Sequence, residues 1–194
     1  MKIVITYDFN GGKDKVLKNY EEEFQQISQV IKSIDANEYK TKISEEQTMK
    51  GKLLYSPTDL NKAFKNEFAK EANGGWNHHS IKCDYSNLGE STNDYKTSTC
   101  HGAFRDMDFV KPGKKLGIEV QFGKYAFMVY DVCAKITIFK NEGIIDAGVE
   151  IVPVKKLADE MSSGVSYFEQ FAWDLNYRGV SNIDTPLYIL GINV

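Results

Sequence analysis

The chain has 194 residues, and its length and composition are those of an ordinary folded protein. Apolar residues make up 42%, which is enough for one sizeable core and short for two, so we expect a single domain spanning residues 1–194. Charged residues (26%) and aromatic residues (12%) exclude a disordered chain. No apolar run is long enough to cross a membrane, and the short apolar start at residues 2–6 is not a signal sequence. These features predict a cytoplasmic protein without membrane contact.

The charge balance and the cysteines limit the possible binding partners and the cellular compartment. Lys and Arg number 24 and Asp and Glu 27, so the net charge is -3. This mild acidity lacks the overall basicity typical of nucleic-acid-binding proteins, and DNA binding would therefore need a local basic face. The three cysteines, Cys83, Cys100 and Cys133, are odd in number and irregularly spaced, which suits a reducing compartment better than a disulfide framework.

The hydrophobic pattern predicts alternating strands and helices. The first half contains a strand over 2–6, one long amphipathic helix over 13–34, a polar loop over 35–51, a helix from the N-cap Ser56 to 73–75, and loops around one or two exposed strands over 74–105. The second half contains a strand over 116–122, a helix over 125–139 whose β-branched tail leaves a strand possible, a central strand over 144–152, helices over 155–161 and 166–175, and a strand over 186–192. This order predicts an α/β fold with a mixed central β-sheet flanked by helices.

The most specific local pattern is a pair of carboxylates on consecutive predicted strands. Asp108 precedes a basic turn at 111–115, and Glu119 lies on the strand that follows. Period-two alternation puts Glu119 and Gln121 on one face of that strand, where Asp108 can join them. Two adjacent carboxylates repel each other, and a hydrated Mg²⁺ ion removes the conflict while lowering the pKa of a bound water. The pattern indicates phosphodiester hydrolysis, although this spacing also arises often by chance.

Several segments, in the same order along the chain, resemble those of one known enzyme family. Residues 118–125 (IEVQFGKY), preceded by 108–111 (DFVK), resemble the catalytic core of BstYI/BglII-like type II restriction endonucleases of the PD-(D/E)xK nuclease superfamily. Further matching segments are SIDA (33–36), LYSP (54–57), LNKAFK (60–65), GVEI (148–151) and EMSSGVSY (160–167). Residues 78–105 do not match, and the Pro112–Gly113 turn lengthens the spacing between the carboxylates. The resemblance implies a restriction-endonuclease-like core, a Mg²⁺ cofactor, double-stranded DNA as substrate and a homodimer.

The same resemblance implies roles for individual residues. Asp108 and Glu119 would bind the metal, with the backbone carbonyl of Val120 as a further ligand. Gln121 stands where most of the superfamily has a lysine. An amide cannot act as a general base, but it can orient the attacking water.

For residues other than Asp108, Glu119, Val120 and Gln121, the resemblance suggests a role, but an alternative role fits as well. His79 is the closest match to a polar residue that this branch places after an upstream tryptophan, here Trp76, and is a candidate catalytic residue; the alternative is a solvated histidine. Lys124 and the serines of one loop match positions that contact bases, although Ser162 or Ser166 suits a helix N-cap equally well. The serines are Ser162, Ser163 and Ser166, and the candidates for phosphate contacts are Lys114, Lys115, Lys62, Lys65 and Lys70.

The resemblance finally suggests a target. We expect a palindrome with a GATC core, R-GATC-Y or a close relative, that is cut before GATC to leave 5′ GATC overhangs. A homodimer formed through the helix over 125–139 would place one site on each strand of the palindrome. The alternative is an inactive endonuclease-like module that only binds DNA, and the two carboxylates argue against it because they would repel phosphate without a cation.

Overall fold

The structure, a computed structural model, describes residues 1–83, 104–178 and 185–194. Its helices and strands in chain order are β1 (Lys2–Phe9), α1 (Gly12–Asn19), α2 (Glu21–Ser33), β2 (Lys42–Ile43), β3 (Leu53–Leu54), α3 (Pro57–Ala69), β4 (Asn77–Lys82), β5 (Phe104–Val110), β6 (Leu116–Val120), α4 (Tyr125–Tyr130), α5 (Ile136–Asn141), β7 (Ala147–Pro153), α6 (Lys155–Ala158), α7 (Phe168–Arg178) and β8 (Leu187–Asn193). None of the helices in these ranges has the length and apolar character needed to span a bilayer.

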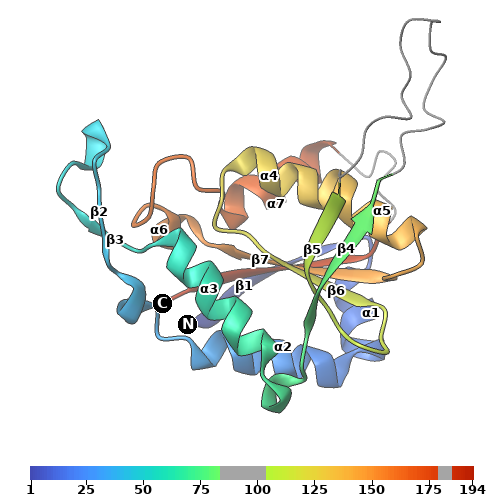
Figure 1. Cartoon of the computed structure of the whole chain (residues 1–194). Coiled ribbons are helices and arrows are strands. Elements are labelled where there is room, and N and C mark those ends of the chain that lie inside the picture. Colours follow the sequence, from blue (N-terminus) through green and yellow to red (C-terminus); the bar gives the residue numbers. More distant parts are fainter. Residues whose placement is uncertain (84–103, 179–184) are drawn as a thin grey trace, which may run out of the picture.

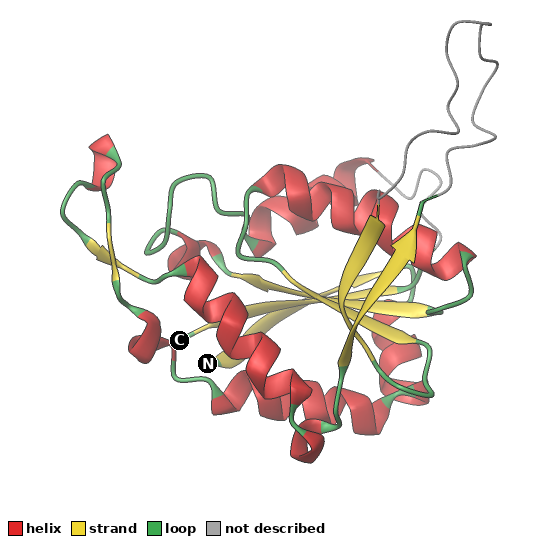
Figure 2. Ribbon diagram, in the orientation of Figure 1, coloured by secondary structure: helices red, strands yellow, loops and turns green. Residues whose placement is uncertain are grey.

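A mixed sheet forms the centre of the molecule (Figures 1 and 2). Within the described ranges it has six strands in the order β1-β8-β7-β6-β5-β4. Strands β6, β7 and β8 run parallel, while β1 pairs antiparallel with β8, and β4 and β5 extend the other edge in antiparallel fashion. The parallel strands are joined by helical crossovers, as parallel pairing requires. This arrangement confirms the predicted α/β fold with a mixed central sheet flanked by helices.

Helices cover both faces of this sheet (Figure 1). Helices α1 and α2 lie on one face, and α4, α5 and α7 lie on the other. The central strand β7 is buried at every position, which explains why its sequence is almost continuously apolar. A single glutamate, Glu150, interrupts that apolar run.

The helix predicted over 13–34 is two helices. Tyr20, with φ of -138° and ψ of 37°, leaves the helical conformation and ends α1. Its hydroxyl donates a hydrogen bond to Asp146 Oδ1 at 2.5 Å, far along the chain. At the start of α1, a Cβ on Gly12 would lie 2.2 Å from the backbone of Leu187, so only glycine allows this close approach to β8. The break therefore reflects long-range contacts that the hydrophobic period does not contain.

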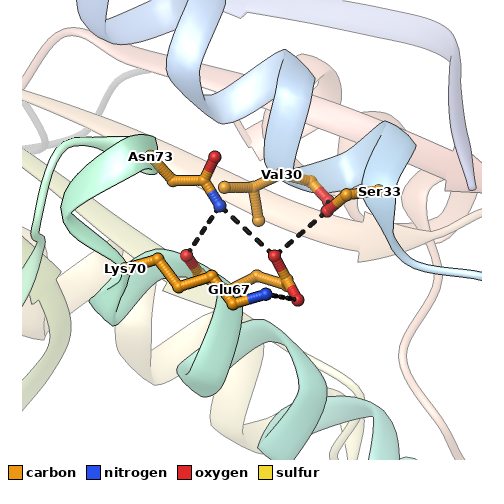
Figure 3. Close-up of polar contacts among 5 residues, drawn as sticks. All are labelled: Val30, Ser33, Glu67, Lys70 and Asn73. Carbon is orange, nitrogen blue, oxygen red and sulfur yellow. Dashed lines mark hydrogen bonds and ion pairs between the residues drawn. The ribbon is translucent and has the colours of Figure 1, made fainter.

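A polar network fastens α3 to α2 (Figure 3). Glu67 of α3 accepts from the Ser33 hydroxyl of α2 at 3.4 Å and pairs with Lys70 at 2.5 Å. Asn73, in the turn after α3, donates to the Glu67 carbonyl at 2.9 Å and to its carboxylate at 3.3 Å. Behind it, the ring of Phe68 packs 4.6 Å from that of Phe109. These contacts hold α3 against α2 and against β5 of the sheet.

The remaining elements largely follow the predicted order. The helix predicted over 125–139 is present as α4 and α5, joined by a π-helical turn at Asp131–Lys135. The predicted polar loop over 35–51 contains β2, which pairs with β3 in a hairpin that projects from the body (Figure 1). The exposed strands expected over 74–105 include β4, an edge strand. Cys83 is a free thiol, while Cys100 lies outside the described residues.

Candidate active site

A cleft of about 1230 Å³ opens between α3, the β4–β5 edge of the sheet and α4. Figure 1 shows how these elements are arranged. The residues that line it include some from α3 (Thr58, Asn61, Lys62, Lys65), β4 (Asn77, His78), β5 (Arg105, Asp106, Asp108), the end of β6 and the residue after it (Glu119, Val120, Gln121), and the helix and π turn that follow (Phe127, Tyr130, Asp131, Lys135). The cleft thus contains the two carboxylates and the amide that the sequence pattern singled out.

Asp108 and Glu119 meet across two neighbouring strands. Phe109 of β5 pairs with Ile118 of β6, and continuing this antiparallel register by one residue puts Asp108 opposite Glu119. One carboxylate oxygen of Asp108, Oδ2, accepts a hydrogen bond from the Val120 N–H at 3.0 Å. The strand that carries Glu119 therefore also fixes the orientation of Asp108.

Glu119 is held by a lysine from the π-helical turn. The Lys135 Nζ lies 2.9 Å from Glu119 Oε2 and 2.7 Å from Asp131 Oδ1, and all three side chains are largely buried. The other oxygen of Glu119, Oε1, is buried and has no hydrogen-bond partner within the described residues. Glu119 thus has one oxygen engaged by the protein and one available to a ligand.

Gln121 lies just beyond β6 and contacts the same turn. Its Nε2 donates to Asp131 Oδ2 at 2.8 Å, and its Oε1 accepts from the Gly123 N–H at 2.6 Å. Glu119 and Gln121 thus reach the same Asp131–Lys135 pair, as expected from period-two alternation along the strand. Because both ends of the Gln121 amide are engaged, this side chain supports the site here; its orientation of a water remains a prediction.

The buried charges shift one another's pKa values. Burial raises the pKa of Glu119 well above its usual range, and the nearby Asp108 raises it further, while Lys135 opposes the shift. Burial also raises the pKa of Glu150, which is fully buried on β7 and is the register partner of Glu119. For Lys135, burial alone would lower the pKa, but Glu119 and Asp131 together raise it. A site with this excess of carboxylates favours a cation.

These residues fit a hydrated divalent cation. The unpartnered Glu119 Oε1 and the adjacent Asp108 carboxylate offer hard oxygen ligands, which Mg²⁺ prefers. In the described part of the chain, no three His, Cys, Asp or Glu side chains are grouped as a complete metal site. The described residues would supply part of the coordination, and water and a substrate phosphate oxygen would complete it.

Comparison with known proteins identifies the family. The family model for the restriction endonuclease BglII/BglIII matches residues 4–192. The chain belongs to this family. It is accordingly a BglII-like type II restriction endonuclease, a site-specific deoxyribonuclease that acts on double-stranded DNA. Enzymes of this family generally use a divalent metal ion.

A solved structure shows the same fold. The crystal structure of free BglII superimposes with a TM-score of 0.63 at 18% sequence identity, covering 100% of this chain and 80% of that one. No curated protein sequence gave a significant match.

The BglII-like fold places His79 away from the cleft. A register irregularity between Asn77 and His79 in the β4–β5 pairing puts Asn77 and His78 along the cleft. The His79 ring instead packs edge-to-face against Phe139, with ring centroids 6.0 Å apart. His78 lies 3.2 Å from the Ser80 hydroxyl. The structure therefore brings His78, and not His79, toward the predicted catalytic residues, because the irregularity changes which side chains share a face.

The serines predicted to contact bases form hydrogen bonds within the protein. The Ser162 hydroxyl bonds to the Lys42 amine, and the Ser163 N–H donates to Glu46 at 2.9 Å, so both anchor the β2–β3 hairpin. Ser166 is fully buried, and its hydroxyl and N–H both donate to the Gly123 carbonyl, at 3.0 and 2.9 Å. Ser166 is thus engaged within the protein, where it supports the chain just beyond β6.

The lysines predicted to contact DNA lie in different parts of the structure. Lys62 and Lys65 line the cleft. Lys114 and Lys115 lie in the turn at the other end of β6 and are not among the lining residues; Lys114 pairs with Glu23 of α2 at 3.3 Å. Lys124 is also outside the lining, directly before α4, where its backbone bridges to Val165.

Three functional candidates were missed by sequence reasoning. Asp131, Lys135 and Glu150 were visible only as charges that interrupt apolar segments. A charged residue on an otherwise buried face is a signal for a site, because an unpaired buried charge is costly. What the sequence did not show is that all three surround Glu119.

Proposed function

We propose that this BglII-like enzyme is a Mg²⁺-dependent homodimer that cuts a palindrome with a GATC core, R-GATC-Y or a close relative, before GATC to leave 5′ GATC overhangs. The observation that carries the chemistry is the pair Asp108 and Glu119 at the floor of the cleft, with Glu119 Oε1 unpartnered. The burial of Glu119 strengthens its charge interactions with a bound phosphate and cation.

Different residues of the site have different roles in hydrolysis. Asp108 and Glu119 hold the cation, with the Val120 carbonyl as a further proposed ligand, and the Val120 N–H orients Asp108. Mg²⁺ bound there lowers the pKa of a water and neutralises charge on the phosphate. Gln121, on the same face, orients water or keeps the adjacent helix in place. Proton removal from water falls to Glu119, a phosphate oxygen or solvent, since an amide has no basic group.

A basic wall explains how an acidic protein binds DNA. The α3 side of the cleft carries Lys62 and Lys65 together with the polar Thr58 and Asn61. These groups contact phosphates, which position the duplex without reading its sequence. The net charge of -3 therefore conceals a local basic surface.

Base recognition is proposed for the surface beside α4. The backbone bridge between Lys124 and Val165 holds Lys124 against the loop that contains Ser162 and Ser163. These three residues can then read one half-site together, Lys124 by donating to guanine O6 and N7. Ser166 supports this surface through Gly123 and does not contact DNA.

An exposed apolar surface supports the homodimer. Phe127 of α4 is 61% exposed, and Trp173 and Tyr177 of α7 are 58% and 70% exposed. The Trp173 and Tyr177 rings stack with centroids 4.3 Å apart, beside a small hollow that includes Tyr125 and Val129. Exposed aromatic side chains that lie together, as Trp173 and Tyr177 do, mark interaction sites. A two-fold axis through this face suits a palindromic substrate, with one cleft for each strand.

A cleavage assay tests the proposal. Plasmid and oligonucleotide duplexes containing AGATCT, GGATCC, AGATCC and a scrambled core are incubated with the protein, with and without Mg²⁺, and the product ends are sequenced. We expect Mg²⁺-dependent cuts before GATC with four-base 5′ overhangs, and the set of sites cut defines the outer bases. Tight binding of these duplexes without cleavage in Mg²⁺ would instead establish an inactive DNA-binding module.

A further inference from the structure

An internal lysine reaches the catalytic carboxylate from a helix. Lys135 is only 12% exposed, and its ammonium lies 2.9 Å from Glu119 Oε2 and 2.7 Å from Asp131 Oδ1. It ends the π-helical turn Asp131–Lys135 that interrupts α4 and α5. Such turns are rare and occur frequently at functional sites, because the extra residue redirects the side chains that follow. Here the turn carries both members of the ion pair that faces Glu119.

We propose that Lys135 is a positioning residue for Glu119 and the built-in counter-ion of the carboxylate cluster, in place of the lysine absent at position 121. This inference rests on the proposed function of Glu119 as a metal ligand. By holding Oε2, the ammonium directs the unpartnered Oε1 of Glu119 to the cation. Gln121 cannot do the same, because its amide is neutral and is engaged by Asp131 and Gly123.

The charges around the site explain why a counter-ion is needed. Asp108, Glu119 and Asp131 gather here, and the fully buried Glu150 lies beside Glu119 on the neighbouring strand. Buried like charges are costly unless they are paired. Lys135 contacts two of these carboxylates at once, and so allows the site to form before metal and DNA arrive. The same positive charge opposes premature binding of a cation to the free protein.

The test compares Lys135→Met with Lys135→Arg. For Lys135→Met we expect kcat to fall by roughly a hundredfold while KM for DNA stays within about twofold, because a group that acts on the metal ligand affects the chemical step and not DNA binding. Removing a positive charge next to the cation should also tighten Ca²⁺ binding to the DNA-free protein by roughly tenfold, measured by calorimetry. Lys135→Arg keeps the charge and should restore wild-type Ca²⁺ affinity and much of kcat.

Two further variants separate positioning from simple folding support. Lys18→Met removes a surface lysine that pairs with Asp14 on α1 and should change neither kcat nor Ca²⁺ affinity. The double variant Asp131→Asn, Lys135→Met removes one charge of each sign, so it should fold even if Lys135→Met does not, and its kcat should stay low because Glu119 is no longer held. Wild-type kcat in the double variant, or unchanged or weaker Ca²⁺ binding in Lys135→Met, would overturn the proposal. If the wild-type protein cut no DNA at all, the proposed function would fail, whereas the Ca²⁺ comparison would still test Lys135.

Discussion

The cleft lysines of α3 allow a quantitative prediction about DNA binding. Lys62 and Lys65 line the cleft, and the Lys62 side chain is 69% exposed with only a weak pairing to Asp59 at 3.5 Å. Replacing either lysine with alanine should remove one phosphate contact from each subunit. In the proposed dimer, each single substitution therefore removes two contacts with the duplex.

The magnitude follows from counterion release. Each phosphate contact contributes about -0.9 to the slope of log K against log salt, so one substitution should flatten the slope by about 1.8 and the Lys62→Ala, Lys65→Ala double variant by about 3.6. Between 50 and 200 mM salt, a slope change of about 1.8 corresponds to roughly a tenfold smaller loss of affinity. The assay is fluorescence anisotropy with a labelled duplex in Ca²⁺ over this salt range. Cognate and random duplexes should respond alike.

The turn lysines provide the matched control. Lys114 pairs with Glu23, and neither Lys114 nor Lys115 lines the cleft, so Lys114→Ala and Lys115→Ala should leave the slope unchanged. Lys124→Ala should differ from both groups, costing about 1 to 3 kcal/mol chiefly on the cognate site. A flattened slope in the Lys114 and Lys115 variants, with no change in the Lys62 and Lys65 variants, would show that DNA follows a different surface and would refute this reasoning.

Three further predictions concern the chemistry, the stability and the assembly. Asp108→Asn and Glu119→Ala should each abolish cleavage in a gel assay while DNA affinity changes little, because they remove metal ligands and not base contacts; normal cutting by either variant would contradict the site. Burial raises the pKa of Glu150, so the folded state retains a proton that the unfolded chain releases above its usual value of 4.5. The free energy of unfolding should therefore fall as pH rises, by up to about 1.4 kcal/mol per pH unit. Glu150→Gln should flatten this decline, measured by urea unfolding at pH 5 and pH 8. An equal decline in the variant and the wild type would contradict this prediction. Trp173→Glu should convert a dimer into a monomer in sedimentation velocity, and a dimer that persists would move the interface elsewhere.

Much of this protein is determined by short-range patterns in its sequence. Alternation along 116–122 predicts a strand that carries Glu119 and Gln121 on one face, and both side chains reach the same π-helical turn, Glu119 at Lys135 and Gln121 at Asp131. The apolar run around Glu150 predicts a central strand because a strand covered on both faces needs apolar residues throughout. The collinear segments around Asp108 predict the family. These features depend on neighbouring residues in the chain, so the sequence contains them directly.

Other features depend on how distant elements meet. At the break between α1 and α2, Tyr20 donates a hydrogen bond to the distant Asp146, whereas the hydrophobic period continues through the break unchanged. The orientation of His78 and His79 depends on an irregularity in the pairing of β4 with β5.

The surroundings of Glu119 show the same distinction most clearly. Lys135 reaches Glu119 only because α4 and α5 cross the sheet and a π turn sets their rotation, and Glu150 lies beside it only because β6 and β7 pair in register. A local pattern specifies which face of an element is buried, whereas the order of strands and the rotation of helices specify which buried groups become neighbours. The sequence by itself therefore determined the predicted catalytic pair and its strand, and the tertiary structure alone decided which charges surround Glu119.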